Sequence, residues 1–326
     1  SIESDNDKYI GCDFDFKYTG LTNKLKIDFN SMHVMSKRHE DIVKNRSLET
    51  QGIIYMLLCQ LFFTANDALI KKLMNIFDNI YILDEIVFVR GIVATSILGL
   101  ILFLSGNLNF KEIASNTKLQ LRGLMEAITA IFFFIGLYNL PMADVYTLLN
   151  LAPILITLAG AIFLGEQVGW RRWSAVIMGF VGVMIVINPT KLEFGYYFIF
   201  PLISAFFIAY RDTYTRKIKK DFNIMHAAFL TSLAVTVVFG FGMLFHTEFI
   251  KFNLVEFLII VLAAIFLIIG YFFSILTIRT TMMSSTSSFR YSTIIWGMLF
   301  GYFYFNEVPS LNMVVGATII VLSGLF

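Results

Sequence analysis

The stretch FVRGIVATSILGLILFL, residues 88–104, is apolar along almost its whole length and carries a single charged residue, Arg90. The hydrocarbon core of a bilayer is about 30 Å thick and is crossed by about 20 apolar residues in a helix. The composition of the whole chain agrees, because 57% of its 326 residues are hydrophobic and only 15% are charged. We therefore interpret residues 88–104 as part of one span of a protein that crosses a membrane several times.

Nine further segments of this kind can be placed along the chain. The ten segments cover roughly residues 52–70, 86–104, 121–139, 143–164, 171–188, 195–211, 225–245, 254–276, 282–304 and 309–326. They predict an all-α membrane protein with ten transmembrane helices. The first 50 residues differ, because they hold eight Lys/Arg and nine Asp/Glu and no long apolar run. This composition is typical of a solvated tail, so we expect residues 1–50 to be a disordered cytoplasmic segment.

The stretch 88–104 also recurs later in the chain. A shift of 141 residues lays it on FLTSLAVTVVFGFGMLF, residues 229–245, and a slightly longer shift pairs Asp67 with Asp212. The matched pairs at 141 are Phe88 with Phe229, Thr95 with Thr236, Gly99 with Gly240, and Glu166 with Glu307. Residues 51–189 and 190–326 are thus two repeats of five spans each. Since five is odd, the second repeat enters from the opposite side, which is the inverted architecture of many secondary transporters.

The distribution of Lys and Arg between loops predicts the orientation. With the N-terminus inside, the external loops carry four such residues, Lys71, Lys72, Lys191 and Lys251. The cytoplasmic loops carry eleven, namely Lys111, Lys118, Arg122, Arg171, Arg172, Arg211, Arg216, Lys217, Lys219, Lys220 and Arg279. We therefore expect both termini to be cytoplasmic.

Residues 150–187, NLAPILITLAGAIFLGEQVGWRRWSAVIMGFVGVMIVI, resemble the end of an EamA domain of the drug/metabolite transporter superfamily. The resemblance lies in Pro153, in Gly165-Glu166 and in the glycine-rich run after them. The second copy, GMLFGYFYFNEVPSLNMVVGATIIVLSGLF from residue 297, departs from it with Asn306 in place of the glycine; Ile294 stands in place of the proline. The resemblance implies two EamA repeats that move a small organic solute across a bacterial inner membrane, by exchange or with a coupling ion such as a proton.

Four candidate charged residues lie deeper in the predicted spans, where charge is costly: Asp67, Arg90, Glu126 and Arg290. We expect Asp67 and Arg90 to form a structural ion pair near the external surface. Glu126 and Arg290 differ in depth by only about 4–5 Å at 1.5 Å per residue. They are therefore predicted either to pair or to bind opposite ends of a zwitterionic substrate, the alternative being a purely structural pair or an arginine that reaches the interface.

Pro153 removes a backbone donor within the fourth span and is predicted to free the carbonyl of Leu149. Asn150 lies on the same face, and the repeat places Tyr291 opposite it. This polar face is either a cavity wall or a contact with a neighbouring helix, and Pro153 is a candidate gating residue. Glu166 and Glu307, at span ends, are interpreted as structural residues that cap neighbouring helices.

Aromatic residues near the predicted cavity suit a planar or cationic organic ligand. The predicted substrate-binding set is Glu126, Arg290, Tyr146, Asn150, Tyr271, Tyr291 and Trp296. Within the superfamily that the chain resembles, solutes include amino acids, nucleosides, drugs and S-adenosylmethionine. Uptake of S-adenosylmethionine or a related nucleoside-like metabolite is therefore one alternative, export of an amino acid or drug another, and a channel or receptor a third of a different class.

Catalytic motifs are missing from the sequence. The segment HEDIV, residues 39–43, begins like a zinc-protease motif but ends in valine instead of the second histidine. Neither a GxSxG elbow nor a GxxxxGK phosphate loop occurs, and two cysteines are too few for a four-cysteine metal site. We therefore expect no enzyme activity, no metal or other cofactor, and no nucleic-acid partner; the expected partners are a small-molecule substrate and the lipid bilayer.

Overall fold

The computed structural model describes residues 29–106, 116–163, 170–187, 195–217, 224–245, 249–280 and 287–325. These described residues form helices, turns and short irregular segments, without strands. The chain divides into two compact units, Ser1–Thr50 and Gln51–Phe326. Of the segment predicted to be a disordered tail, the described residues 29–50 are helical. They form the beginning of α1, Phe29–Phe77, whose later part belongs to the second unit.

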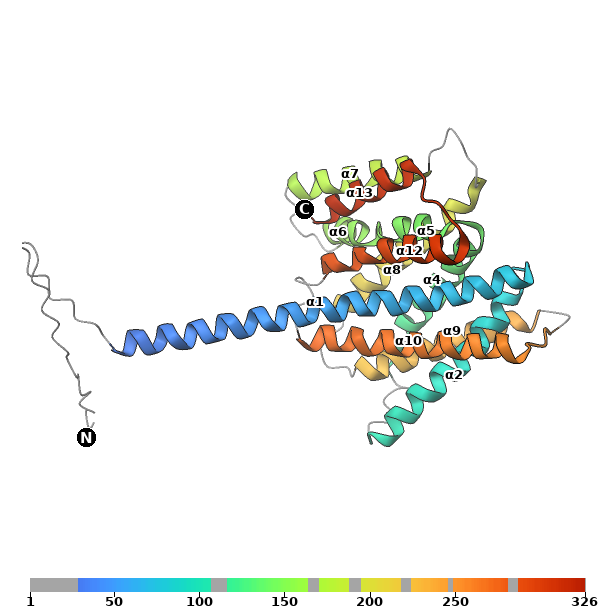
Figure 1. Ribbon diagram of the computed structural model, residues 1–326, viewed down its shortest axis with the longest axis horizontal. Coiled ribbons are helices and arrows are strands. Elements are labelled where there is room, and N and C mark those ends of the chain that lie inside the picture. Colours follow the sequence, from blue (N-terminus) through green and yellow to red (C-terminus); the bar gives the residue numbers. More distant parts are fainter. Residues whose placement is uncertain are drawn as a thin grey trace, which may run out of the picture. The chain divides into compact units, whose positions relative to one another are not determined.

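The helices follow one another along the chain as shown in Figure 1. The first repeat continues with α2 (Ile82–Leu104), α4 (Thr117–Asn139), α5 (Met142–Leu149), α6 (Ala152–Phe163) and α7 (Trp170–Ile187). The second repeat contains η1 (Gly195–Phe198), α8 (Ile199–Lys217), α9 (Ile224–Met243), α10 (Leu254–Thr280), η2 (Ser287–Tyr291), α12 (Ser292–Phe305) and α13 (Leu311–Leu325). One apolar core draws on helices of both repeats, which makes the second unit a single packed body.

Five helical segments in the described part of the chain are long and apolar enough to cross a membrane. They are Leu48–Phe77, Ile82–Leu104, Thr117–Asn139, Met225–Met243 and Leu254–Thr277. Three shorter apolar segments, Met142–Ile156, Val176–Ile187 and Leu311–Ser323, fall below the length of a full span. Length and composition therefore identify five candidate spans, fewer than the ten that hydropathy alone predicts.

The fourth predicted span is interrupted in its middle. α5 ends at Leu149 and α6 begins at Ala152, while the carbonyl of Leu151 accepts the backbone N–H groups of Ile154 and Leu155. Pro153 thus lies in the first turn of α6, where an N–H group has no intrahelical acceptor and proline is well tolerated. The fourth predicted span is therefore two helices, and Pro153 stands just after the break between them.

The ninth predicted span is interrupted at the corresponding place. A 3₁₀ turn, η2, ends at Tyr291, and α12 begins at Ser292. α6 begins at Ala152, and adding the repeat shift of 141 gives 293. α12 begins at Ser292, so the two helices begin within one residue of the same point in the two repeats. The second copy carries Ile294 where the first carries Pro153, so the interruption does not depend on proline.

Corresponding helices of the two repeats pack against each other in opposite directions. A Cβ atom on Gly240 of α9 would lie 2.7 Å from Cε2 of Phe88 on α2, and one on Gly99 would lie 3.2 Å from Cε2 of Phe229. Phe88 and Phe229 are equivalent in the repeat, as are Gly99 and Gly240. Each phenylalanine therefore fills the notch left by the other repeat's glycine, which is the reciprocal pattern of a two-fold axis.

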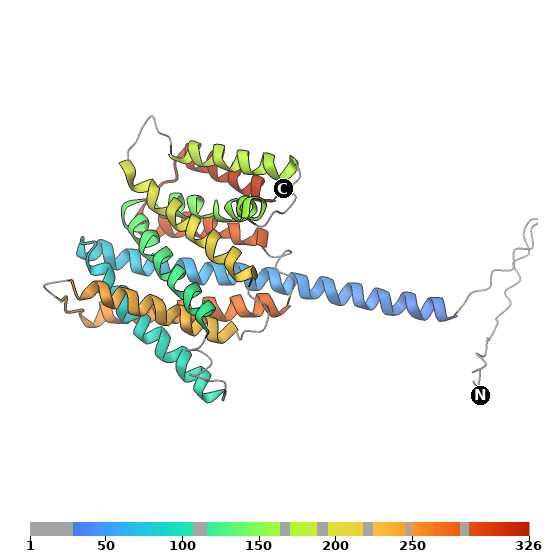
Figure 2. The same ribbon diagram turned by 180° about the vertical axis from the view of Figure 1, so that it is seen from behind.

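The last helices of the two repeats, α7 and α13, also pack reciprocally. They lie side by side in both views of the fold (Figures 1 and 2). A Cβ atom on Gly182 would lie 2.9 Å from the carbonyl oxygen of Gly316, and one on Gly316 would lie 2.7 Å from that of Gly182. Only glycine at these two positions lets the backbones approach so closely, as at other helix contacts in membranes.

Candidate functional site

A cavity of about 280 Å³ lies between the two repeats of the second unit. Its wall is built from α1, α2, α4, α5 and α6 of the first repeat and from α8, α9, α10, η2 and α12 of the second. Five charged residues line it: Asp67, Arg90, Glu126, Asp212 and Arg290. Aromatic side chains make up much of the remainder, namely Phe63, Phe133, Phe134, Tyr146 and Tyr271.

The two helix interruptions meet at this cavity. The amide Nδ2 of Asn150 donates to Oγ1 of Thr293 at 2.9 Å and to the carbonyl of Tyr146 at 2.7 Å. Oγ1 of Thr293 in turn donates to the carbonyl of Arg290 at 3.0 Å. Carbonyls at helix interruptions are costly when left without donors inside a membrane protein. Here Asn150 and Thr293 each donate to a carbonyl of their own interruption, and Asn150 also donates to the hydroxyl of Thr293.

Asp67 and Arg90 lie close together on α1 and α2, but Asn66 stands between their charged groups. Nη1 of Arg90 donates to Oδ1 of Asn66 at 3.1 Å, and Nδ2 of Asn66 donates to Oδ1 of Asp67 at 2.8 Å. The second carboxylate oxygen of Asp67 accepts the hydroxyl of Tyr146 at 2.7 Å. The predicted direct ion pair of Asp67 with Arg90 is therefore wrong: the amide of Asn66 bridges the two.

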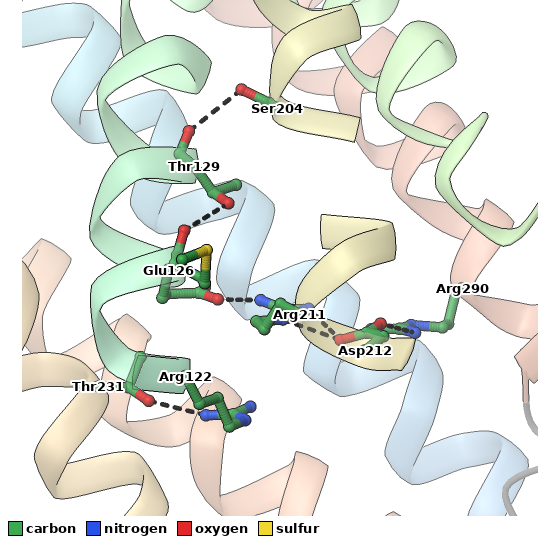
Figure 3. Close-up of polar contacts among 9 residues, drawn as sticks. Arg122, Glu126, Thr129, Ser204, Arg211, Asp212, Thr231 and Arg290 are labelled. Carbon is green, nitrogen blue, oxygen red and sulfur yellow. Dashed lines mark hydrogen bonds and ion pairs between the residues drawn. The ribbon is translucent and has the colours of Figure 1, made fainter. Parts of the chain in front are cut away.

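A chain of four charged residues borders another part of the cavity (Figure 3). Glu126 of α4 pairs with Arg211 of α8, whose Nη2 lies 2.8 Å from Oδ1 of Asp212. Nη1 of Arg290 lies 3.5 Å from the other oxygen of Asp212. The predicted pairing of Glu126 with Arg290 is therefore wrong, because Arg211 and Asp212 are inserted between them.

Arg211 and Asp212 are the two members of this charged chain that hydropathy missed. The predicted sixth span ended at residue 211 and placed Arg211 in a cytoplasmic loop, but α8 continues to Lys217 and buries Arg211 to 9% exposure. The match of Asp212 to Asp67 in the repeat was the available signal, because Asp67 lies in the first helix of its repeat and Asp212 in that of the second.

A second ion pair joins the two repeats away from the cavity wall. Nζ of Lys71 lies 2.5 Å from Oε1 of Glu307 and donates to the carbonyl of Leu140 at 2.7 Å. The other oxygen of Glu307 accepts the backbone N–H of Met142, the first residue of α5, at 2.8 Å. Lys71 is only 4% exposed within α1, so its predicted place in an external loop is wrong. Glu166, the repeat partner of Glu307, lies outside the described residues.

Two residues of the predicted substrate-binding set lie elsewhere. Arg290 and Thr293, three residues apart, face the cavity, whereas Tyr291 is packed into the apolar core at 5% exposure. Trp296 is also absent from the cavity wall. The predicted residues that do line it are Asp67, Arg90, Glu126, Tyr146, Asn150, Pro153, Tyr271 and Arg290, and Gln60, Asn66, Asp212 and Thr293 join them.

Comparisons with known proteins place both repeats in one family. The EamA-like transporter family matches residues 50–188 and 194–326. The pseudopaline exporter CntI of Pseudomonas aeruginosa is 21% identical over 273 residues, 83% of this chain and 94% of the exporter. An S-adenosylmethionine uptake transporter of Rickettsia bellii is 24% identical over 298 residues, 88% of this chain and 95% of that protein.

A solved crystal structure also shares the fold. It matches with a TM-score of 0.55 at 15% sequence identity and covers 86% of this chain and 95% of its own. An integral membrane protein of two EamA repeats agrees with the apolar helices and with the reciprocal packing of α2 on α9. Since the family match extends over both repeats, the chain belongs to the EamA-like transporter family.

Proposed function

We propose that this protein is a secondary transporter that moves a small organic metabolite across a bacterial inner membrane by alternating access. The observation that carries the proposal is the contact of Asn150 with Thr293, where one interrupted helix from each repeat meets the other at a shared cavity. Substrate sites of inverted-repeat transporters lie at such points, because interrupted helices expose backbone polar groups to the cavity and the two repeats rock around it.

The proposed topology has ten spans in two inverted repeats, with both termini in the cytoplasm. Antiparallel packing of α2 on α9 supports the inversion. Removing the buried Lys71 and Arg211 from the loop count leaves ten basic residues inside (11 − 1) against three outside (4 − 1), which still favours the same orientation.

Reporter fusions test this topology. Fusions at Lys111 and Lys217 are expected to report the cytoplasm, and fusions at Asp78 and Lys251 the external side. A cytoplasmic signal at Lys251 would place the second repeat parallel to the first and remove the inverted arrangement.

S-adenosylmethionine is the first substrate to test, because uptake transporters for it resemble this chain over nearly their whole length. It is an amino acid that also carries a sulfonium cation and an adenine ring. The acid Asp67 and the aromatic residues of the wall suit such a cationic, planar solute. Export of an amino-acid-derived metabolite is the second candidate, since the exporter CntI is equally well covered.

Flux in proteoliposomes separates the classes of function. The purified full chain is reconstituted, and uptake of labelled S-adenosylmethionine is measured with and without the same compound inside. We expect saturable uptake that internal S-adenosylmethionine accelerates, as exchange requires. Saturable flux that responds to a proton gradient and not to internal solute would assign ion coupling. Non-saturable flux would assign a channel. Binding of S-adenosylmethionine or another small solute, without flux of any of them, would assign a receptor.

A further inference from the structure

Arg90 carries the only guanidinium on the cavity wall that lacks an acid partner among the described residues. The residue is 5% exposed, Nη1 binds the neutral amide of Asn66, and Nε has no hydrogen-bond partner within the described part of the chain. Its guanidinium carbon lies 5.4 Å from the ring centroid of Phe134. Arg290, by contrast, faces Asp212. A buried guanidinium at the wall of a cavity, with one N–H group that makes no hydrogen bond within the described residues, is suited to a ligand anion.

Asp67 offers the opposite charge close by. Each of its carboxylate oxygens accepts one hydrogen bond, from Asn66 and from Tyr146, and a carboxylate has lone pairs for about four. No Lys or Arg lies within ion-pair distance of Asp67 in the described structure, although Arg90 is near enough to interact with it electrostatically. Asp67 therefore keeps the capacity to accept hydrogen bonds from a ligand cation.

Asn66 holds these two charges apart. Its carbonyl oxygen accepts from Arg90 and its amide nitrogen donates to Asp67, so both groups are anchored to the same neutral side chain. Without this spacer, the guanidinium and the carboxylate would be free to close into a direct pair. The arrangement leaves a positive and a negative group side by side at the wall, which is complementary to a ligand that carries both charges at a short separation.

We propose that Arg90 and Asp67 bind an α-amino-acid group, with Arg90 holding the carboxylate and Asp67 the ammonium. The inference rests on the proposed transport function, because it names the substrate class of the same cavity. The planar fork of Arg90 matches a carboxylate with two parallel N–H donors. The chain from Glu126 to Arg290 is internally paired and supplies no equivalent unpaired charge. Phe63, Phe134 and Tyr271 then surround the remainder of the ligand.

Matched ligands test the proposal on the unaltered protein. Binding to the purified full chain in lipid nanodiscs is measured by calorimetry for S-adenosylmethionine and for its decarboxylated form. The twenty amino acids are tested beside their decarboxylated amines and their deaminated acids. Among the ligands that bind, we expect loss of either group to weaken affinity about 100-fold, as for other buried charge contacts.

Variants test the assignment of each group. Arg90→Lys keeps the charge but loses the fork, so we expect the preference for a zwitterion over its amine to fall at least about tenfold. Asp67→Asn should reduce the preference for the zwitterion over its deaminated acid by a similar factor. Arg122→Lys is the matched control, because Nη1 of Arg122 donates to Thr231 and Arg122 is not part of the cavity wall. If Arg90 were only structural, Arg90→Lys would lower the unfolding temperature and leave the preference for the zwitterion over its amine unchanged.

The outcomes separate this inference from the proposed function. Equal affinity of the unaltered protein for a zwitterion and its decarboxylated amine overturns the inference. So does a folded Arg90→Lys variant with an unchanged preference, or transport of solutes that lack one of the two groups while no amino acid binds. Binding that requires both groups without flux in proteoliposomes overturns transport and leaves the assignment of Arg90 and Asp67 standing.

Discussion

Asn150 and Thr293 join the two repeats at 2.9 Å, where the side-chain amide of one helix interruption donates to the hydroxyl of the other. The two residues are 143 positions apart, two more than the repeat shift of 141. Each residue also donates a hydrogen bond to a carbonyl of its own segment. The bond between them therefore joins two interruptions that each have their own internal hydrogen bond. Such a contact can break and re-form while each interruption keeps its shape.

A double-mutant cycle on this pair measures the contact. Asn150→Ala and Thr293→Val should each lower stability, and their coupling should be about 0.6 kcal/mol and at most about 1.7 kcal/mol, the range for side-chain hydrogen bonds between membrane helices. Thermal unfolding of the purified protein in detergent gives the four values. Independent, strictly additive effects would show that the bond contributes nothing to stability.

Pro153→Ala should change stability by less than about 1 kcal/mol and transport by less than about threefold. Alanine restores an N–H group in the first turn of α6, where no intrahelical acceptor is expected, and the interruption at Asn150 and Leu151 is held by other bonds. Uptake and unfolding temperature are compared with those of the unaltered protein. A large loss of turnover in a stable variant would support Pro153 as a gating residue.

Hydropathy predicted where the helices lie but misjudged their ends. The first and sixth predicted spans end at residues 70 and 211, and Lys71 and Arg211 were therefore counted with the loops. The structure buries both, because each meets an acid from a distant helix or connection: Glu307, 236 positions from Lys71, and Glu126, 85 positions from Arg211. No local pattern contains such a partner. The same limit applies to Asn66, whose role depends on Arg90 of the neighbouring helix.

The repeat carried more information than any single segment. It paired Phe88 with Phe229 and Gly99 with Gly240, and these residues form the reciprocal contact of α2 with α9. The interruption of the fourth span was attributed to Pro153, yet the repeat also aligned Asn150 with Tyr291, where the second helix is interrupted without proline. The residues that hold the interruptions are polar side chains whose acceptors become visible only once both helices are in place.

Gly240→Ala should destabilise the protein more than Gly99→Ala. The added Cβ would lie 2.7 Å from the ring of Phe88 in the first variant and 3.2 Å from the ring of Phe229 in the second. Overpacking of this kind costs about 1–3 kcal/mol. Unfolding temperatures give the order, and Phe88→Leu should partly rescue Gly240→Ala by making room. Equal losses in both variants, without rescue, would contradict the reciprocal packing.

Glu307→Leu should be more harmful than Lys71→Met. Loss of Glu307 strands the buried ammonium of Lys71 and the backbone N–H of Met142, and breaking a buried pair costs about 3–5 kcal/mol. Loss of Lys71 leaves Glu307 bound to the N-terminus of α5, where the helix dipole favours a carboxylate. The double variant should recover part of the loss but not the contribution of the Met142 bond, about 1–3 kcal/mol. Full recovery in thermal unfolding would show that Glu307 acts only through Lys71.

Substitutions in the charged chain from Glu126 to Arg290 should destabilise the protein more where the substituted side chain is more buried. Arg211→Met removes the central member, whose side chain is 10% exposed, and leaves Glu126 without its partner. We expect a loss of about 1–3 kcal/mol, below that of a fully buried pair because Glu126 is 27% exposed. Arg290→Met should cost less than about 1 kcal/mol, since its side chain is 41% exposed and its pair with Asp212 is long at 3.5 Å.

The double variant Glu126→Leu with Arg211→Met tests the pairing itself. It removes one charge of each sign and leaves Asp212 facing Arg290, so its unfolding temperature should exceed that of Arg211→Met alone. The combination of Glu126→Leu with Arg290→Met should show no such recovery, because Arg211 and Asp212 separate these two residues. Recovery in the second combination and not in the first would mean that Glu126 and Arg290 are direct partners in the membrane, and the chain drawn in Figure 3 would have to be replaced.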